Sequence, residues 1–167
     1  MTERNVFKVG VSRDLLMPNG EPCFNPAAFD VLKGNAAIDW EWIPEEVLEI
    51  APEIAARYDG LHLNLPRVSA ASVGRGDCRV KIIARNGVGY DSVDVAALTA
   101  KKIALTNTPV AVRRPVAVAT LTMLFALAGR LLEKNELSHT GRWNDRTAYM
   151  GQGLTSRTLG IVGAGSI

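Results

Sequence analysis

The sequence predicts an α/β protein in which a parallel sheet is joined by crossover helices. Short runs rich in β-branched residues alternate with helical patterns along the first part of the chain, as in repeated strand–helix–strand units. The composition of the 167 residues, 47% hydrophobic and 22% charged, is that of a globular protein. It excludes disorder, collagen and coiled coil as descriptions of the whole chain.

Five short segments are predicted strands because they are rich in aliphatic or β-branched residues. The second of them alternates apolar and polar residues, which is typical of a strand near a sheet edge. In chain order the predicted strands are Phe7–Val11, Ile38–Trp42, Leu61–Leu63, Val80–Ala84 and Ile103–Thr106.

Three helices are expected between these strands, at Pro26–Lys33, Pro44–Arg57 and Val93–Lys101. Asn25 is suited to cap the first, because its side chain can accept a hydrogen bond from the first turn. Pro52 must break or restart the second, since proline lacks a backbone N–H. Aspartate and serine residues just before the third favour a helix N-terminus there.

A long helix is predicted from Val116 to about Ser138, and a final strand at Thr158–Val162. The first half of the helix is apolar nearly all round and is expected to be buried on several sides, whereas its second half is amphipathic. A helix of this kind often links two domains. The expected organisation is a first domain at 1–115, an interdomain helix at 116–140 and the start of a second domain at 141–167.

The charge balance and the cysteines narrow the class of protein. Nineteen Lys and Arg against seventeen Asp and Glu give a net charge of +2, too balanced to indicate nucleic acid or an anionic membrane as a partner. The longest apolar stretch, Val116–Gly129, is shorter than the roughly 20 residues of a membrane span. Cys23 and Cys78 lack the spacing of a metal site, so no metal is expected. With no signal peptide recognised, a cytoplasmic protein with free thiols is expected.

A glycine motif, Gly163-Ala-Gly165, directly follows the last predicted strand. In dinucleotide folds the first such glycine permits a tight turn, and the second lets the backbone approach a pyrophosphate. Strand plus Gly-x-Gly also occurs in many α/β proteins without that role. The chain ends at Ile167 in an apolar run, where the third glycine would be the next residue, so we expect the sequence to be cut within the motif.

A second motif, Gly87-Val88-Gly89, lies between a predicted strand and a helix start. Ligands of parallel α/β sheets bind outside the carboxyl ends of the strands. Two glycines there free the backbone to present N–H groups to an anion such as a carboxylate. The alternative is a simple tight turn between strand and helix, which needs glycine for its own geometry.

At these residues the sequence resembles the D-isomer-specific 2-hydroxyacid dehydrogenases, nearest to the phosphoglycerate, glyoxylate and hydroxypyruvate reductase group. The segments that carry the resemblance, in the family's order and spacing, are Val80-Lys-Ile-Ile-Ala-Arg-Asn-Gly-Val-Gly-Tyr-Asp-Ser-Val-Asp94, Thr106-Asn-Thr-Pro109, Gly141-Arg-Trp143 and Thr158-Leu-Gly-Ile-Val-Gly-Ala-Gly165. The resemblance implies a flavodoxin/Rossmann-like substrate domain plus the beginning of a second, NAD(P)-binding Rossmann domain. It also implies hydride transfer between NAD or NADP and a small D-2-hydroxy or 2-keto acid, in a cytoplasmic homodimer.

The resemblance further implies site residues. Gly87, Val88 and Gly89 would hold the substrate carboxylate, and Asn64 lies where phosphoglycerate-specific members carry arginine, which puts that substrate in doubt unless Arg67 compensates. The cofactor residues would be Thr120, Gly163, Gly165, Ser166 and Ile167.

No catalytic residue is assigned within the chain. The family's catalytic arginine, glutamate and histidine come from later segments, so the 167-residue chain alone is expected to be inactive. His62, expected as a satisfied core or cleft-edge residue, and His139, at an exposed helix end, do not replace that histidine. Arg113 and Arg114 are either a solvated pair or an attraction for an acidic ligand. The alternatives to an enzyme are a non-catalytic truncated relative and an NAD-linked interaction module.

Overall fold

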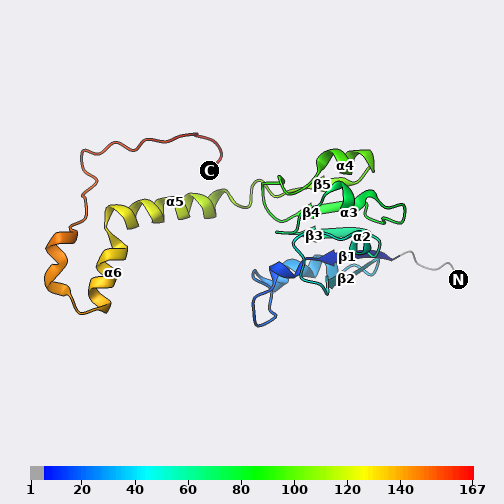
Figure 1. The fold of residues 1–167 in the computed structure, drawn as a ribbon, viewed down its shortest axis with the longest axis horizontal. Coiled ribbons are helices and arrows are strands. Elements are labelled where there is room, and N and C mark those ends of the chain that lie inside the picture. Colours follow the sequence, from blue (N-terminus) through cyan, green and yellow to red (C-terminus); the bar gives the residue numbers. More distant parts are fainter. Residues whose placement is uncertain (1–5) are drawn as a thin grey trace. The chain divides into compact units, whose positions relative to one another are not determined.

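The computed structural model describes residues 6–167, and the chain divides into two compact units, Met1–Pro109 and Val110–Ile167. The first unit contains a sheet of five parallel strands in the order β2-β1-β3-β4-β5 (Figure 1). This confirms the predicted α/β class, and β2 lies at the edge, as its alternating pattern predicts. The strands are β1 Phe7–Val11, β2 Ile38–Trp42, β3 Gly60–Leu63, β4 Ile82–Arg85 and β5 Ala104–Thr106.

Short helices connect these strands. Pro26–Phe29 forms a 3-10 turn that runs directly into an α-helix, and the Asn25 side chain accepts a hydrogen bond from the Ala27 N–H at 3.0 Å, as expected of a cap. The α-helices of this unit are α1 Asp30–Lys33, α2 Pro52–Ala55, α3 Ala70–Gly74 and α4 Val95–Ala100.

The predicted helix Pro44–Arg57 is reduced to α2. Pro52 lies in the first turn of α2, where its missing N–H costs nothing. The residues before it instead pair with a distant segment, because Ile50 N–H donates to Arg67 O and Arg67 N–H donates to Leu48 O. This long-range pairing replaces the intrahelical hydrogen bonds that residues 44–51 would need.

Two apolar clusters surround the sheet. The larger includes Leu61, Leu63 and Ile83 from the central strands, packed with residues from α2, α3 and α4. The smaller is built on Val11 and Phe29, whose ring stacks on Trp40 with centroids 5.0 Å apart. These clusters hold the strands in place and leave their carboxyl ends to the loops that follow.

Polar side chains fasten the opposite, amino-terminal edge of the sheet. Asp59 lies just before β3, with its side chain only 8% exposed, and accepts hydrogen bonds from Lys8 N–H at 3.0 Å and from Arg79 at 2.8 Å. The Lys81 ammonium lies 3.6 Å from its other oxygen. Burial alone would raise the pKa of this carboxyl, but the Lys8 hydrogen bond and the two cations together lower it below its ordinary value.

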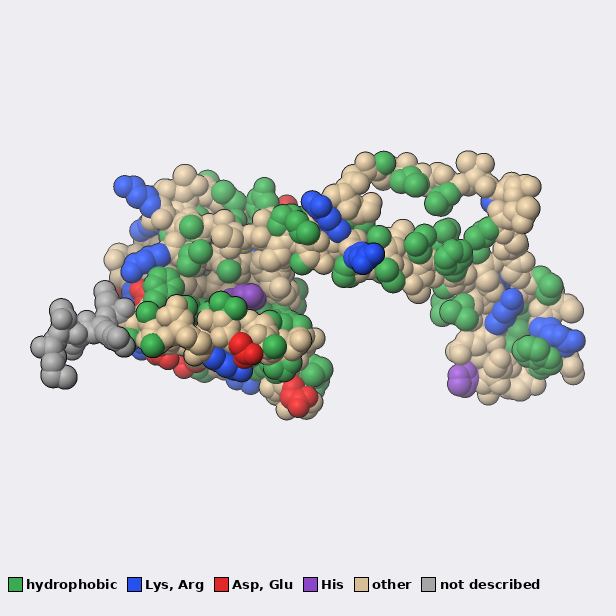
Figure 2. Space-filling view, turned by 180° about the vertical axis from the view of Figure 1, so that it is seen from behind, with side chains coloured by type: hydrophobic (Ala, Val, Ile, Leu, Met, Phe, Trp, Pro, Cys, Tyr) green, Lys and Arg blue, Asp and Glu red, His purple; other side chains and the backbone are tan. Residues whose placement is uncertain are grey.

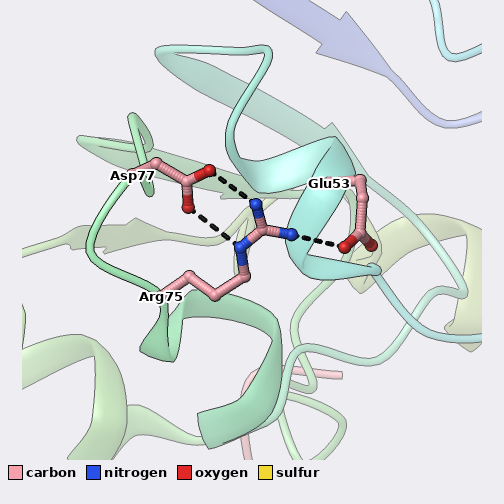
Figure 3. Close-up of polar contacts among 3 residues, drawn as sticks. All are labelled: Glu53, Arg75 and Asp77. Atoms are coloured by element: carbon pink, nitrogen blue, oxygen red, sulfur yellow. Dashed lines mark hydrogen bonds and ion pairs between the residues drawn. The ribbon is translucent and has the colours of Figure 1, made fainter.

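A further ion cluster lies on the surface of the same unit. The Arg75 guanidinium donates to both oxygens of Asp77, at 3.0 and 2.6 Å, and also contacts Glu53 of α2 (Figure 3). All three side chains are at least 45% exposed. Water therefore screens these charges, and the cluster adds little to stability.

The second unit begins with two helices rather than the single helix predicted from Val116 to Ser138. They are α5 Arg113–Ala128 and α6 Leu131–His139, bent by 63° at the break. Gly129 ends α5, and Arg130 adopts a left-handed backbone at φ 52°, so the hydrogen-bond ladder cannot continue. No single helix within residues 6–167 is long and apolar enough to cross a membrane, although the bent pair together has the length and composition.

The expectation that the first half of this helix is buried on several sides is not met within the chain. No residue of α5 is buried, and Leu121, Met123 and Phe125 are at least half exposed. Figure 2 shows hydrophobic side chains gathered over this unit. The reason is that the second unit supplies only one short helix, a 3-10 segment and an irregular tail to pack against it.

The predicted strand Thr158–Val162 does not form. After the 3-10 segment Trp143–Tyr149, the chain has no helix or strand as far as Ile167. A strand needs a neighbouring strand for its backbone hydrogen bonds, and the described part of the second unit contains none.

Candidate functional site

Polar side chains gather where the parallel strands of the first unit end. Asp14 follows β1, Asn64 follows β3, Asn86 follows β4, and Asn107 and Thr108 follow β5. Because the carboxyl ends of parallel strands share one edge of the sheet, segments far apart in sequence meet there. This edge is the candidate site.

Asn64 lies at the centre of a hydrogen-bonded chain across this edge. Its amide donates to Asp14 Oδ2 at 2.8 Å, and its carbonyl oxygen accepts from the Asn86 amide at 3.4 Å. Its backbone N–H donates to Ser12 Oγ at 3.1 Å. Asn64 therefore joins the ends of β1, β3 and β4, and its amide is already engaged in holding the edge together.

The Gly87–Gly89 loop is fastened to the segment after β5. Gly87 N–H donates to Thr108 Oγ1 at 3.0 Å, and Thr108 N–H donates back to Gly87 O at 2.8 Å. The Asn107 amide donates to Val88 O at 2.9 Å. Gly87 has φ +140°, a conformation that residues with a side chain rarely adopt, and a Cβ there would lie 3.2 Å from the Arg85 guanidinium. The sequence therefore needs glycine at position 87.

The next two N–H groups of the loop are free. Within the described part of the chain, the N–H groups of Val88 and Gly89 have no hydrogen-bond acceptor, and both residues are exposed. Successive free N–H groups at the end of a parallel sheet form a concavity that suits an anion. Of the three predicted carboxylate-binding residues, Gly87 thus uses its N–H for a hydrogen bond within the fold. The N–H groups of Val88 and Gly89 remain available to a ligand.

Some buried polar atoms near this edge lack a hydrogen-bond partner. The buried atoms that lack a partner within residues 6–167 are Asp14 Oδ1, His62 Nε2 and Arg85 Nε. Burial lowers the pKa of the His62 imidazole, and the nearby Asp14 carboxylate opposes that shift only in part. His62 was expected to be satisfied, but its Nε2 is not. Residues 6–167 contain no cluster of three or more His, Cys, Asp or Glu side chains able to hold a metal ion.

The second unit brings the five predicted cofactor residues together. An open, mainly apolar groove of about 760 Å³ lies between α5 and the C-terminal tail, residues 159–167. Its lining includes all five predicted cofactor residues, Thr120, Gly163, Gly165, Ser166 and Ile167. Thr120 Oγ1 donates to Val116 O at 2.9 Å within the helix, and its lone pairs remain available. Arg113 and Arg114, at the start of α5, are exposed.

The glycines of this groove suit close approach by a ligand. Gly163 has φ +85°, as the tight turn of the motif requires, and a Cβ at Gly163 or Gly165 would meet nothing within 4 Å. The residues therefore fit a dinucleotide in composition and in the openness of their backbone. The helix N-terminus that faces the pyrophosphate in such folds is not formed by the described residues.

Sequence reasoning missed Asp14, Asn107 and Thr108 as parts of the site. In the sequence, Asn107 and Thr108 belong only to a segment that resembles the family, and their bonds to the glycine loop depend on β4 and β5 being neighbours. Asp14 gave one usable signal, because an acidic residue shortly after a predicted strand is a candidate for the ligand edge.

Comparison with known proteins identifies related chains. A family model described as D-isomer specific 2-hydroxyacid dehydrogenase, catalytic domain, matches residues 25–162. The chain is 31% identical over 140 residues to D-3-phosphoglycerate dehydrogenase of a Synechocystis strain, covering 83% of this chain and 24% of that protein. It is 32% identical over 134 residues to glyoxylate reductase of Thermococcus onnurineus, covering 77% of this chain and 40% of that protein.

Solved structures agree with the fold. A Polaromonas protein assigned to the D-isomer specific 2-hydroxyacid dehydrogenases matches with TM-score 0.76 and 24% identity, over 96% of this chain and 49% of that one. The NAD⁺-bound 3-phosphoglycerate dehydrogenase of Entamoeba histolytica matches with TM-score 0.59 and 25% identity, over 74% of this chain and 39% of that one. The chain thus spans 24% and 40% of the lengths of the two curated relatives above.

Proposed function

The chain belongs to the D-isomer specific 2-hydroxyacid dehydrogenase family, and from this premise we propose that it provides the substrate-binding part of an oxidoreductase. The reaction is hydride transfer between NAD or NADP and a small D-2-hydroxy acid or 2-keto acid. The observation that carries the proposal is the pair of free N–H groups on Val88 and Gly89 at the carboxyl edge of the sheet.

These two N–H groups receive the carboxylate of the substrate. A carboxylate accepts hydrogen bonds from backbone N–H groups strongly, because the acceptor is ionised. The Arg85 guanidinium packs beside Gly87 and adds positive charge next to the loop. Anchoring the carboxylate fixes where the adjacent C2 atom lies, and a fixed position is what a hydride transfer requires.

The groove of the second unit is the proposed place for the cofactor. Gly163, Gly165, Ser166 and Ile167 would hold its pyrophosphate side, with Thr120 toward the nicotinamide side. A bound nicotinamide supplies the hydride acceptor or donor. The apolar residues of α5 in the groove exclude water from one side of such a ligand.

The preferred substrate is a short 2-keto acid such as glyoxylate or hydroxypyruvate. Asn64 stands where phosphoglycerate-specific members carry arginine, and its amide is occupied by Asp14 and Asn86. It therefore brings no positive charge for a phosphate. Glyoxylate reductase is among the relatives that support this choice.

The 167-residue chain by itself is proposed to bind the acid without turning it over. A general base must be within hydrogen-bond reach of its proton. His62 is a poor candidate, because its Nε2 is buried and burial lowers the pKa of its imidazole. The resemblance to the family further implies that its catalytic arginine, glutamate and histidine are not among these 167 residues.

We further propose a cytoplasmic homodimer that binds neither nucleic acid nor membrane. The exposed apolar residues of α5 that lie outside the groove, including Met123 and Phe125, support association through this helix. Sedimentation should show a dimer or larger species, and a monodisperse monomer would contradict the dimer.

Calorimetric titration of the chain tests the proposed function. Glyoxylate and hydroxypyruvate should bind, whereas glycolaldehyde, which has the same two-carbon skeleton as glyoxylate but no carboxylate, should not. D-3-phosphoglycerate should bind more weakly than hydroxypyruvate. Equal binding of glycolaldehyde, or no binding of either acid, would reject a carboxylate site. NADH oxidation with glyoxylate should be absent, and turnover would show that the catalytic groups lie within this chain.

A further inference from the structure

Three hydrogen bonds join the segment after β5 to consecutive peptide groups of the glycine loop. Thr108 Oγ1 accepts from Gly87 N–H at 3.0 Å, Thr108 N–H donates to Gly87 O at 2.8 Å, and the Asn107 amide donates to Val88 O at 2.9 Å. The two partners are neighbours in sequence, and their strand lies beside β4 in the sheet. The bonds therefore form one clamp on the loop.

Planarity of the peptide group gives this clamp a consequence for the free donors. In a trans peptide the C=O of one residue and the N–H of the next point in opposite directions in one plane. Holding Gly87 O therefore directs the Val88 N–H, and holding Val88 O directs the Gly89 N–H. Each free N–H group is therefore oriented by a hydrogen bond to the carbonyl oxygen of its own peptide group, which points in the opposite direction.

We infer that Asn107 and Thr108 are positioning residues that aim the Val88 and Gly89 N–H groups at the substrate carboxylate. This inference rests on the proposed function. Neither side chain needs to touch the substrate, because each acts through the loop. Asn107 controls the Gly89 donor through Val88 O, and the Thr108 hydroxyl fixes the start of the loop by binding Gly87 N–H.

Two substitutions remove the side-chain parts of the clamp while keeping their size. Asn107→Leu removes the donor to Val88 O, and Thr108→Val removes the acceptor for Gly87 N–H. Each should weaken glyoxylate binding about threefold to tenfold, the range expected for loss of one hydrogen bond. Thr108→Ser keeps the hydroxyl and should bind like the wild type. Thr106→Val removes an exposed hydroxyl, one without a hydrogen bond in the structure, from the last residue of β5, and should leave binding unchanged.

Amide hydrogen exchange in the unsubstituted chain tests the clamp without any variant. The Gly87 N–H should exchange slowly, and the Val88 and Gly89 N–H groups should exchange fast. Equal exchange at all three, or wild-type affinity in both Asn107→Leu and Thr108→Val, would overturn this inference. Absence of glyoxylate binding by the wild type would instead overturn the proposed function, while the exchange pattern still decides whether the clamp exists.

Discussion

The two edges of the sheet are built from similar residues but differ in how far their polar groups are satisfied. At the amino-terminal edge, the buried Asp59 carboxylate accepts a hydrogen bond from a backbone N–H and pairs with two cations, Arg79 and Lys81. At the carboxyl edge, buried atoms of Asp14, His62 and Arg85 lack partners, and two N–H groups of the loop after β4 are free. The first edge holds strands together, and the second keeps donors for a ligand.

This difference follows from the physical demands on each edge. A buried charge is tolerated only when paired, and the pairing at Asp59 links β1, β3 and β4 through the two oxygens of one carboxylate. A binding site must instead carry groups that the fold does not use. We therefore expect changes at the amino-terminal edge to alter stability alone, and changes at the carboxyl edge to alter anion binding more than stability.

The largest effect on stability is expected from Asp59→Ala. The substitution leaves the Lys8 N–H without its acceptor and removes both ion pairs, so the free energy of unfolding should fall by about 3 kcal/mol. Denaturant unfolding measures this change. Glyoxylate affinity of the folded variant should equal that of the wild type, and a loss of affinity would contradict the division between the edges.

The same variant should reveal a pH dependence. The folded protein holds the pKa of Asp59 below its ordinary value of 3.8. The contribution of the ionised carboxylate to the free energy of unfolding is therefore complete above pH 3.8, and it is lost as the pH falls through the lower pKa of the folded state. The stability gap between wild type and Asp59→Ala should therefore narrow below about pH 4.

Gly87→Ala should affect binding most strongly at the other edge. Alanine at φ +140° is strained, and its Cβ would press on the Arg85 guanidinium, so the loop must shift and carry the Val88 N–H with it. Glyoxylate affinity should fall about fivefold or more, because about 1–3 kcal/mol of backbone strain would displace the N–H groups from the carboxylate. Gly76→Ala is the matched control, since its Cβ would meet nothing within 4 Å. Equal losses in both variants would argue against a special role for the loop.

A smaller, pH-dependent effect is expected at His62. Its pKa in the folded chain is lowered from 6.5 by burial, so protonation favours unfolding, and stability should decline as the pH falls below 6.5. The slope for one proton is at most about 1.4 kcal/mol per pH unit. His62→Gln should lack this component when unfolding is measured between neutral and mildly acidic pH. An identical pH profile in both proteins would rule out His62 as its source.

The smallest effect is expected at the surface cluster of Figure 3. Glu53→Gln removes one of the two carboxylates around Arg75, and both side chains are largely exposed. Because water screens such pairs, the midpoint of thermal unfolding should not move beyond experimental error at physiological salt. A clear destabilisation would show that exposed ion pairs matter more to this unit than their exposure indicates.

The sequence allowed the sheet to be predicted well because strand patterns are local. The five strands predicted for the first unit all form, with small shifts at their ends such as Ile82–Arg85 in place of 80–84, whereas the sixth, predicted at Thr158–Val162, does not. One helix prediction failed where distant contacts decide the outcome. Leu48 and Ile50 pair with Arg67, a contact that no local pattern reveals. The long helix breaks for a local reason, because Gly129 ends α5 and Arg130 adopts a left-handed backbone. Helix α3 was missed although Ser69 and Ser72 form a reciprocal cap at its start.

The candidate site was predictable where its residues form a local sequence pattern. The glycine loop stands out in the sequence because its residue types are unusual, and the structure brings the five predicted cofactor residues to one groove. Which N–H groups are free could not be predicted, because that depends on Thr108 and Asn107 reaching the loop from a neighbouring strand. Asn64 is expected at the substrate site only through the family resemblance, and its role in linking three strand ends depends on side chains just after β1 and β4 that the sequence does not place beside it.

Mapping amide chemical shifts during titration of the chain with glyoxylate tests the central claim most directly. The claim predicts the largest shifts at the N–H groups of Val88 and Gly89, with little change at Gly87 and none at Lys8 on the opposite edge. Glycolaldehyde at the same concentrations should leave all four unchanged. Shifts that spare Val88 and Gly89, or that centre on the amino-terminal edge, would contradict the assignment of the anion site to the carboxyl edge of the sheet.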